Sequence, residues 1–524
     1  MKVFLLHRNQ DFNPKAERPW NEFSLATDLE LGTIFNAMAG EDKYMDRVVQ
    51  NVFFTGFNNS TETIFYRQEI LKDCLINPSV VREIYQLTVD TAEEERKHWW
   101  LDLSKTPTGV LVESIDILDM LTNMLRKLRQ ISEVNEGKFN SEGFKRFFSM
   151  IQAEVGENYL QEVSKDIDEL RFRRGLLFSA DLKVEEIDPN YILRQPPGRK
   201  SWWREWLQER SSTAYTYHLD PRDEAGATIL GNLKDRGLNR VANALGQASE
   251  HVRNFLHVLR EELAFYVGCL NLHEKLSAKG ATVCFPAAMP ATDRYHEFKE
   301  LRDTSLVLTM NQQVVGNIVN ANNKNLIIIT GANQGGKSSF LRSIGVAQIM
   351  MQSGCFVTAD EFRAEICPAL FTHYKREEDA TMTQGKFDEE LVRMNDIVKH
   401  IKINSIVLFN ESFAATNARE GAEIARQITT ALLEKKMKVF FVSHIYEFTH
   451  PFFVDAKETT TFLRAEREVN GTRSFQLVEK EPLETSYGAD LYAEVFADIT
   501  IASNPSDNCK NHPDQTENGI SNEL

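Results

Sequence analysis

The sequence contains little cysteine, and its cysteines are scattered. The six thiols in 524 residues are Cys74, Cys269, Cys284, Cys355, Cys367 and Cys509. None of them forms a C-x-x-C pair or lies near a pair of histidines, which argues against a disulfide framework and against a zinc site. We therefore expect reduced and buried thiols.

Long apolar runs are also absent. No stretch approaches the ~20 consecutive apolar residues that a membrane span requires, and the apolar part of the N-terminal segment 1–9 is too short for a signal peptide. We expect a cytoplasmic protein without a membrane partner. A hydrophobic content of 42% supplies core material for about two to four domains.

Basic residues are in deficit. Lys and Arg number 60 against 76 Asp and Glu, for a formal net charge of −16. A protein that mainly grips duplex DNA usually presents a basic surface, and this chain has no overall excess. The best local candidate is the segment 195–210, in which basic side chains interleave with tryptophans: Arg199, Lys200, Arg204 and Arg210 with Trp202, Trp203 and Trp206. The mixture suits nucleic acid or a partner protein, and a half-buried helix packed on a neighbour is the alternative.

A glycine-rich loop after a short apolar run is the clearest motif. The run Leu326–Ile329 is typical of a strand buried on both faces of a parallel sheet. The residues from 331 to 338 match the spacing G-x-x-x-x-G-K-[ST] without a mismatch, and a helix is expected to begin there. The pattern predicts a site for a nucleoside triphosphate with Mg²⁺.

Each residue type in this loop has a chemical reason. Gly331, Gly335 and Gly336 allow the backbone to turn its N–H groups toward phosphate oxygens. Lys337 is expected to place a cation on the β- and γ-phosphates, and Ser338 to provide a hydroxyl ligand for Mg²⁺. The positive end of the helix dipole adds to the attraction for an anion.

Two later strands are expected to end beside this loop. The apolar run Ser405–Phe409 leads into Asn410 and Glu411, so that Glu411 would polarise the attacking water. The run Val439–Val442 leads to His444, which would sense or stabilise the γ-phosphate. A purely structural role is the alternative for this histidine.

The chain divides near residue 290. From about Glu22 to Lys279 apolar residues recur at spacings of three and four, as expected of long helices. We predict a helical region at 1–290 with an inserted loop or small subdomain at about 185–215, an α/β region at 291–500 and a disordered tail at 501–524. Within the α/β region we predict strands at 326–329, 356–358, 405–409 and 439–442, and a helix at 422–435.

The second half resembles the ATPase domain of the MutS family of DNA mismatch-repair proteins, within the ABC-type ATPases. Thr330–Ser339 is similar to the family's TGPNMGGKST, and Ser443-His444 to its histidine switch. The other similar blocks are Asn410-Glu411 with Thr416–Gly421 (DE…TSTxDG), Gly385–Glu390 (STFxxE), Val315–Asn317 (an asparagine-containing loop beside the nucleotide) and Thr485–Gly488 (the SYG segment). The helical half resembles the family's core and lever helices, so that the resemblance covers most of residues 20 to 500.

The resemblance implies roles for individual residues. It implies an α-helical core and lever region followed by a P-loop ATPase domain. The catalytic residues would be Lys337, Glu411 and His444. Ser338 would bind Mg²⁺ directly, and Asn410 would bind it through a water molecule. The nucleotide would be bound by Gly331, Asn333, Gly335, Gly336, Lys337, Ser338, Ser339 and Asn317.

The sequence departs from the family in several places. Core-like helices begin within the first 30 residues or so, and the chain ends in a short polar tail. We therefore expect neither the N-terminal mismatch-reading domain nor a C-terminal nuclease extension. Asn410 stands where the family has an aspartate, and Asn417 where it has a serine. An amide accepts a hydrogen bond from metal-bound water but adds no negative charge, so hydrolysis is expected to be slow or Mg²⁺ binding weak.

The resemblance implies an ATP-hydrolysing homodimer in which each nucleotide lies between two subunits. We expect association with branched or recombining DNA, without reading of mismatches. Two alternatives remain open at this point. One is a regulatory ATPase switch whose levers grip a protein partner, and the other is a nucleotide-binding scaffold with little turnover.

Overall fold

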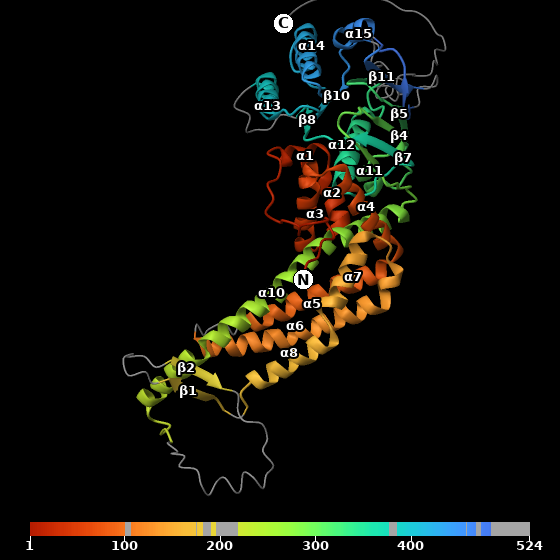
Figure 1. Cartoon of the computed structure of the whole chain (residues 1–524). Helices are drawn as coiled ribbons and strands as arrows, with labels where there is room; N and C mark the ends of the chain where they lie inside the picture. Colours follow the sequence, from red (N-terminus) through yellow and green to blue (C-terminus); the bar gives the residue numbers. More distant parts are fainter. Residues whose placement is uncertain are drawn as a thin grey trace, which may run out of the picture.

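The computed structural model describes residues 1–99, 106–173, 175–181, 190–194, 218–376, 385–456, 458–467 and 473–483. Figure 1 shows an elongated molecule with an α/β region at one end, short helices in the middle and an arm of long helices at the other end. The predictions for the segments 195–210, Thr485–Gly488 and 501–524 lie outside the described residues. Among the helices of the described part, none is long and apolar enough to cross a membrane.

Helices dominate the chain from Glu22 to Ala278, as predicted. An antiparallel hairpin of β1 (Leu177–Asp181) and β2 (Asn190–Arg194) lies at the tip of the arm. Only β2 belongs to the predicted insertion at 185–215. The helices before it are α1 (Glu22–Asp28), α2 (Leu31–Ala39), α3 (Lys43–Thr55), α4 (Thr61–Ile76), α5 (Pro78–Trp99), α6 (Pro107–Asn135), α7 (Glu142–Glu154) and α8 (Glu157–Leu170), with 3₁₀ turns η1 (Gly56–Asn58) and η2 (Glu136–Lys138).

One helix connects the arm to the centre of the molecule. Helix α10 (Glu224–Ala278) has 55 residues, which gives it a length of about 80 Å at 1.5 Å per residue. It packs along α6 and α5 in the arm and on α2, α3 and α4 in the middle (Figure 1). From Leu259 to Leu270 nearly every residue is buried, because other helices surround this part of α10.

The rest of the chain forms two sheets. The larger has the strand order β12-β11-β6-β10-β9-β8, and all of its neighbouring strands are parallel except the edge pair β11 and β12. The smaller has the order β3-β7-β4-β5. The strands are β3 (Ala287–Met289), β4 (His296–Leu301), β5 (Asn317–Asn320), β6 (Leu326–Gly331), β7 (Glu361–Glu365), β8 (Leu370–Tyr374), β9 (Ile406–Asn410), β10 (Lys438–Val442), β11 (Thr460–Arg467) and β12 (Arg473–Glu479).

Helices cover both faces of the larger sheet. Ile327 and Ile329 of β6 belong to the core shared with α12 (Lys337–Ser353), whereas Leu326 and Ile328 point into a second core. The second core is closed by α13 (Lys386–His400), α14 (Ala418–Glu434) and α15 (Tyr446–Asp455). Helix α11 (Thr304–Thr309) lies between the helical region and the α/β region. Burial on both faces explains why the strands read as unbroken apolar runs.

Most of the predicted elements are confirmed. The strands predicted at 326–329, 405–409 and 439–442 are β6, β9 and β10, and the helix predicted at 422–435 is α14. The strand predicted at 356–358 is wrong, because Val357 makes only an isolated bridge to Cys284. An apolar run in a buried loop cannot be distinguished from a strand by periodicity. The other strands of the two sheets were not predicted: β3, β4, β5, β7, β8, β11 and β12. The boundary near 290 remains a prediction.

The cysteines in the described residues are free thiols, as expected. Four of them are buried, but Cys284 is only half-buried. No group of three or more His, Cys, Asp or Glu side chains in the described residues is placed to hold a metal ion.

The N-terminal segment is held by two buried charges from the helical region. The carboxylate of Glu262 on α10 accepts hydrogen bonds from the backbone N–H groups of Leu5 (2.6 Å), Leu6 (3.1 Å) and Phe12 (2.8 Å). The buried guanidinium of Arg67 donates to the carbonyl of Leu6 (2.8 Å). Burial of these groups is compensated by hydrogen bonds from a segment without regular structure of its own.

The Glu262 contact should make stability depend on pH. Burial raises the pKa of this carboxyl from its ordinary value of 4.5 to about 7, against the three N–H donors, which lower it. The folded state therefore holds the proton more tightly than the unfolded chain, and the contribution to the free energy of unfolding falls as pH rises from 4.5 through 7. Glu262→Gln cannot ionise, so its melting temperature should rise relative to that of the wild type between about pH 5 and pH 8.

Thermal unfolding at several pH values measures this difference. Glu250→Gln, at an exposed position of the same helix, is the matched control and should follow the wild type. Parallel curves for wild type and Glu262→Gln would contradict the prediction.

Candidate functional site

The glycine-rich loop connects β6 to α12, and its backbone requires left-handed conformations. The φ angles are 108° at Gly331, 58° at Gln334 and 86° at Gly336. A Cβ atom at Gly331 would lie 2.8 Å from the backbone nitrogen of Ala465 and 2.9 Å from its oxygen. Left-handed residues placed between right-handed ones turn successive N–H groups to the same side of the backbone. Such a loop forms a concave site for an anion.

The loop ends at the N-terminus of α12, which no side chain caps. The first-turn N–H groups of a helix have no partner within the helix, and the dipole adds positive charge there. The ammonium of Lys337 is buried and donates to the carbonyls of Gly331 (3.0 Å) and Ala332 (2.8 Å). Burial lowers the pKa of Lys337, a shift that the Glu411 carboxylate opposes. An anion on the loop would give this cation a charged partner.

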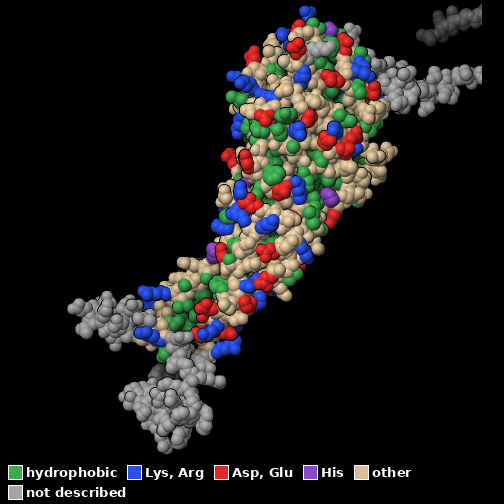
Figure 2. All heavy atoms as spheres, turned by 45° about the vertical axis from the view of Figure 1, so that its right-hand side comes forward, with side chains coloured by type: hydrophobic (Ala, Val, Ile, Leu, Met, Phe, Trp, Pro, Cys, Tyr) green, Lys and Arg blue, Asp and Glu red, His purple; other side chains and the backbone are tan. Residues whose placement is uncertain are grey.

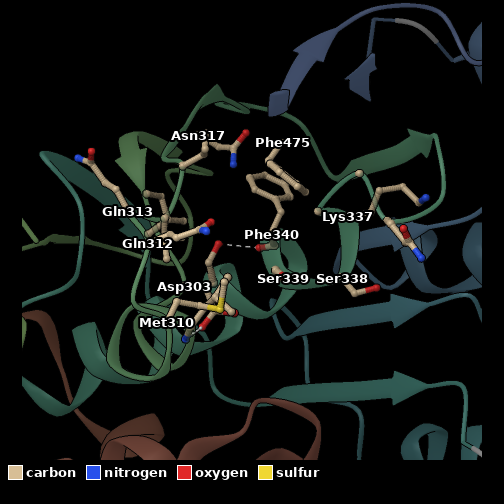
Figure 3. A pocket seen from close by; sticks show the side chains of 18 of the residues that line it. Asp303, Met310, Gln312, Gln313, Asn317, Lys337, Ser338, Ser339, Phe340 and Phe475 are labelled. Atoms are coloured by element: carbon tan, nitrogen blue, oxygen red, sulfur yellow. Dashed lines mark hydrogen bonds between the residues drawn. The ribbon is translucent and has the colours of Figure 1, made fainter. Parts of the chain in front are cut away.

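A cavity of about 400 Å³ lies beside the loop. Figure 3 shows Asp303, Met310 and Gln312 on one side of the cavity and Lys337 and Ser338 on the other, with phenylalanine rings between them. Its walls are polar where the loop lies and mix polar with apolar side chains elsewhere. The apolar lining comprises Leu301, Leu306, Met310, Val314, Val315, Phe340 and Phe475.

Ser338 meets the end of β9, which is separated from β6 by β10 in the sheet. Its hydroxyl donates to the Oδ1 atom of Asn410 over 3.0 Å. These two oxygens are hard donors of the kind that Mg²⁺ prefers, and the ion usually takes its other ligands from phosphate and water. The pair fits such an ion but contributes no negative charge.

Glu411 follows Asn410 and lines the cavity. Its φ angle of 53° is left-handed, and its N–H group donates to the carbonyl of Val442 on β10 (2.9 Å). His444 follows the end of β10, with Nδ1 4.0 Å from Oε1 of Glu411. The structure thus brings together the loop, Glu411 and His444, although His444 is not among the residues that line the cavity.

The remaining predicted residues also line the cavity, with different surroundings. Asn333 is an exposed loop residue and Ser339 is half-buried in the first turn of α12. Asn317 is buried, and its Oδ1 atom accepts from the N–H group of Leu477 (2.8 Å). Asn317 therefore ties β5 to β12 at the rim of the cavity.

Sequence reasoning missed the contribution of β12. Phe475 lines the cavity, has a left-handed φ angle of 57° and is 47% exposed as a residue. Arg473 donates to Oε1 of the loop residue Gln334 (2.8 Å). No local signal marks these residues, because only the antiparallel pairing of β12 with β11 brings them over the loop.

Comparison with known proteins agrees with the resemblance seen in the sequence. Residues 59–279 match the model of the MutS2 N-terminal domain, and residues 327–504 match that of MutS domain V. The chain is 28% identical over 166 residues to the DNA mismatch repair protein MutS of Petrotoga mobilis, covering 32% of this chain and 20% of the relative. It is 25% identical over 304 residues to the Endonuclease MutS2 of Geobacillus thermodenitrificans, and this match covers 53% of this chain and 38% of the relative.

A third relative gives a longer match. The chain is 25% identical over 370 residues to the Endonuclease MutS2 of Ligilactobacillus salivarius, which covers 68% of this chain and 45% of the relative. The chain thus spans less than half the length of each of these three relatives.

The geometry of Gly331 leads to a prediction about stability. In Gly331→Ala the new side chain would sit on a residue with a left-handed φ angle, and its Cβ atom would press against the backbone of Ala465. Both effects strain the folded state, so the free energy of unfolding should fall by about 1–3 kcal/mol. Gly32→Ala is the matched control, because a Cβ atom at this position of α2 meets nothing within 4 Å. Urea titration measures both, and equal midpoints for the two variants would contradict the prediction.

Proposed function

Because this chain belongs to the MutS family, we propose that it binds ATP with Mg²⁺ in the cavity beside the loop 331–336 and hydrolyses it. The observation that carries the proposal is the meeting of the loop, the Ser338–Asn410 pair and Glu411 at the carboxyl ends of β6 and β9, two parallel strands that flank β10. Ligands of open α/β sheets bind at the carboxyl ends of the strands.

The loop would bind the triphosphate through its backbone N–H groups and Lys337. The ammonium now donates to two loop carbonyls, and it would exchange them for phosphate oxygens when nucleotide binds. This exchange favours binding, because a charge-assisted hydrogen bond is stronger than one to a neutral carbonyl. The apolar side chains around Met310 and Phe475 would cover the base.

Ser338 directly, and Asn410 through a water molecule, would hold Mg²⁺, which supplies positive charge to the phosphates. Glu411 would orient the attacking water, and His444, 4.0 Å from Glu411, would stabilise the γ-phosphate. Asn410 provides no carboxylate for the metal, so we propose that turnover is slow.

We further propose that the protein works as an ABC-type homodimer on DNA. The segment 416–421 of one subunit would close over the nucleotide of the other. Helix α10 would carry the movement to the arm, because it runs from the centre of the molecule into the arm (Figure 1). On the face in Figure 2, Lys and Arg side chains are intermixed with Asp and Glu, which favours only modest binding to phosphates.

Glu411→Gln tests the proposed chemistry. This change keeps the shape of the side chain and removes its charge, so ATP should still bind while turnover falls by about 100-fold, and ATP-bound dimer should accumulate. Lys337→Ala should instead lose nucleotide affinity, because it removes the buried cation of the loop. Equilibrium binding, steady-state ATPase assays and size measurements with ATP distinguish the two variants.

If Glu411→Gln keeps full turnover, a residue other than Glu411 orients the attacking water. Wild-type affinity and turnover in Lys337→Ala would exclude the nucleotide site. If the wild type binds ATP without any turnover, the protein is a nucleotide-binding scaffold.

Binding to DNA should show no preference for a mismatched over a matched duplex and should fall steeply with salt. If the segment 195–210 binds the phosphates, reversing the charges of Arg199 and Lys200 should weaken binding to all sequences alike. The salt slope should decrease by roughly two, because two side chains would no longer neutralise a phosphate each. Reversal of the exposed Lys435 and Lys436 is the control.

Salt-titrated binding to matched, mismatched, single-stranded and branched DNA measures these effects. A mismatch preference would contradict the prediction. Absence of binding to every DNA at low salt, with and without ATP, would favour a protein partner.

A further inference from the structure

The turn that follows β9 is strained at two residues. Glu411 has a φ angle of 53° and Phe413 one of 63°, a region that side chains other than glycine rarely adopt. Such conformations persist only where the surroundings determine them, and they concentrate at active sites. The contacts of residues 411–413 therefore bear on how Glu411 is aimed.

A buried histidine from the neighbouring strand holds this turn. His373 on β8 is 0% exposed, and its Nδ1 atom lies 2.7 Å from the hydroxyl of Ser412. Its Nε2 atom lies 3.0 Å from the carbonyl oxygen of Glu390 on α13. The ring of Phe413 stacks on the imidazole, with centroids 5.2 Å apart and planes at 20°. The carboxylate of Glu390 accepts from the N–H group of Phe413 (2.7 Å).

The surroundings of His373 select one tautomer. Burial, and then the charge of Arg393, lowers the pKa of the imidazole to about 4, so it is neutral near pH 7. The Glu390 carbonyl can only accept a hydrogen bond, so the neutral ring carries its hydrogen on Nε2 and leaves Nδ1 as an acceptor facing the Ser412 hydroxyl. The single hydrogen of that hydroxyl is directed to His373 in either case, because the two acceptors within its reach are Nδ1 and the carbonyl oxygen of the same residue, which lies 2.5 Å away.

A second helix limits the turn from the other side. A Cβ atom at Gly421 of α14 would lie 2.2 Å from the carbonyl oxygen of Phe413. The turn is therefore enclosed by α13, α14 and β8, so the backbone at Glu411, between Asn410 and Ser412, has little freedom to reorient.

We propose that His373 is a positioning residue for Glu411, and that through Ser412 it fixes the turn that directs the Glu411 carboxylate into the cavity. The inference rests on the proposed function, in which Glu411 orients the attacking water. His373 does not line the cavity, so it acts only through the turn. Loss of its hydrogen bond should misplace Glu411 while the loop and Lys337 remain intact.

The test compares the same substitution at the two ends of β9. Ser412→Ala removes the donor to His373 and should lower kcat by about 10- to 100-fold, the scale expected for a small misplacement of a catalytic group. KM for ATP and the affinity for a fluorescent ATP analogue should stay within about twofold. Ser405→Ala is the matched control, because Ser405 is also a buried serine and precedes the opposite end of the strand.

A pair of variants at position 373 makes the test independent of Ser412. His373→Phe keeps an aromatic ring and loses both hydrogen bonds, whereas His373→Asn can place an acceptor near the Nδ1 position. His373→Asn should therefore retain more of kcat than His373→Phe. If Ser412→Ala does not fold, this pair decides the question.

Hydrogen exchange gives a measurement that requires no turnover. The amides of residues 411–413 should exchange faster in Ser412→Ala than in the wild type and Ser405→Ala. Unchanged exchange at these amides would overturn the inference. So would unchanged kcat in an active enzyme, or equal losses of kcat and nucleotide affinity. A wild type that binds no nucleotide would exclude the proposed function, and the exchange result would still decide whether His373 and Ser412 hold the turn.

Discussion

Helix α12 is packed so tightly that the two regions of the protein depend on its position. Of its 17 residues, 14 are buried, and a Cβ atom at Gly345 would approach Leu29 of the helical region at 2.7 Å and Leu408 of β9 at 2.8 Å. Arg342 forms ion pairs with Asp303, which lines the cavity, and with Glu30 between α1 and α2. Because interiors are close-packed, the loop at the start of α12 cannot shift without moving its neighbours on both sides.

The candidate site combines a fixed cation with few carboxylates. The buried Lys337 ammonium donates to two loop carbonyls, and the amide oxygen of Asn410 accepts a hydrogen bond from Ser338. Among the described residues that line the cavity, Asp303 and Glu411 carry carboxylates, and that of Asp303 is paired with Arg342. An anionic ligand would thus meet little repulsion, which suits binding of a triphosphate. The shortage of negative charge leaves a metal ion more dependent on the phosphates themselves.

Much of the fold was predictable because periodicity reports which faces are buried. The long helices of the first half and strands β6, β9 and β10 follow from apolar spacing. The loop 331–336 could be recognised since its glycines serve a local backbone requirement, which the positive φ angles of Gly331 and Gly336 confirm. The strand predicted at 356–358 failed because Val357 is buried by tertiary packing, without a neighbouring strand beyond the bridge to Cys284.

The sequence by itself determined the long helices, the strands β6, β9 and β10 and the local chemistry of the loop, since these depend on residues close together in the chain. It also pointed to Glu411 and His444, because parallel strands bring their carboxyl ends to one edge. Only the tertiary structure decided that Phe475 borders the cavity, that Glu262 holds the N-terminal segment and that His373 contacts Ser412 in the turn at Glu411. These contacts join residues far apart in the chain, such as Leu5 and Glu262. Their physical basis is the satisfaction of buried polar groups, which has no periodic signature in the sequence.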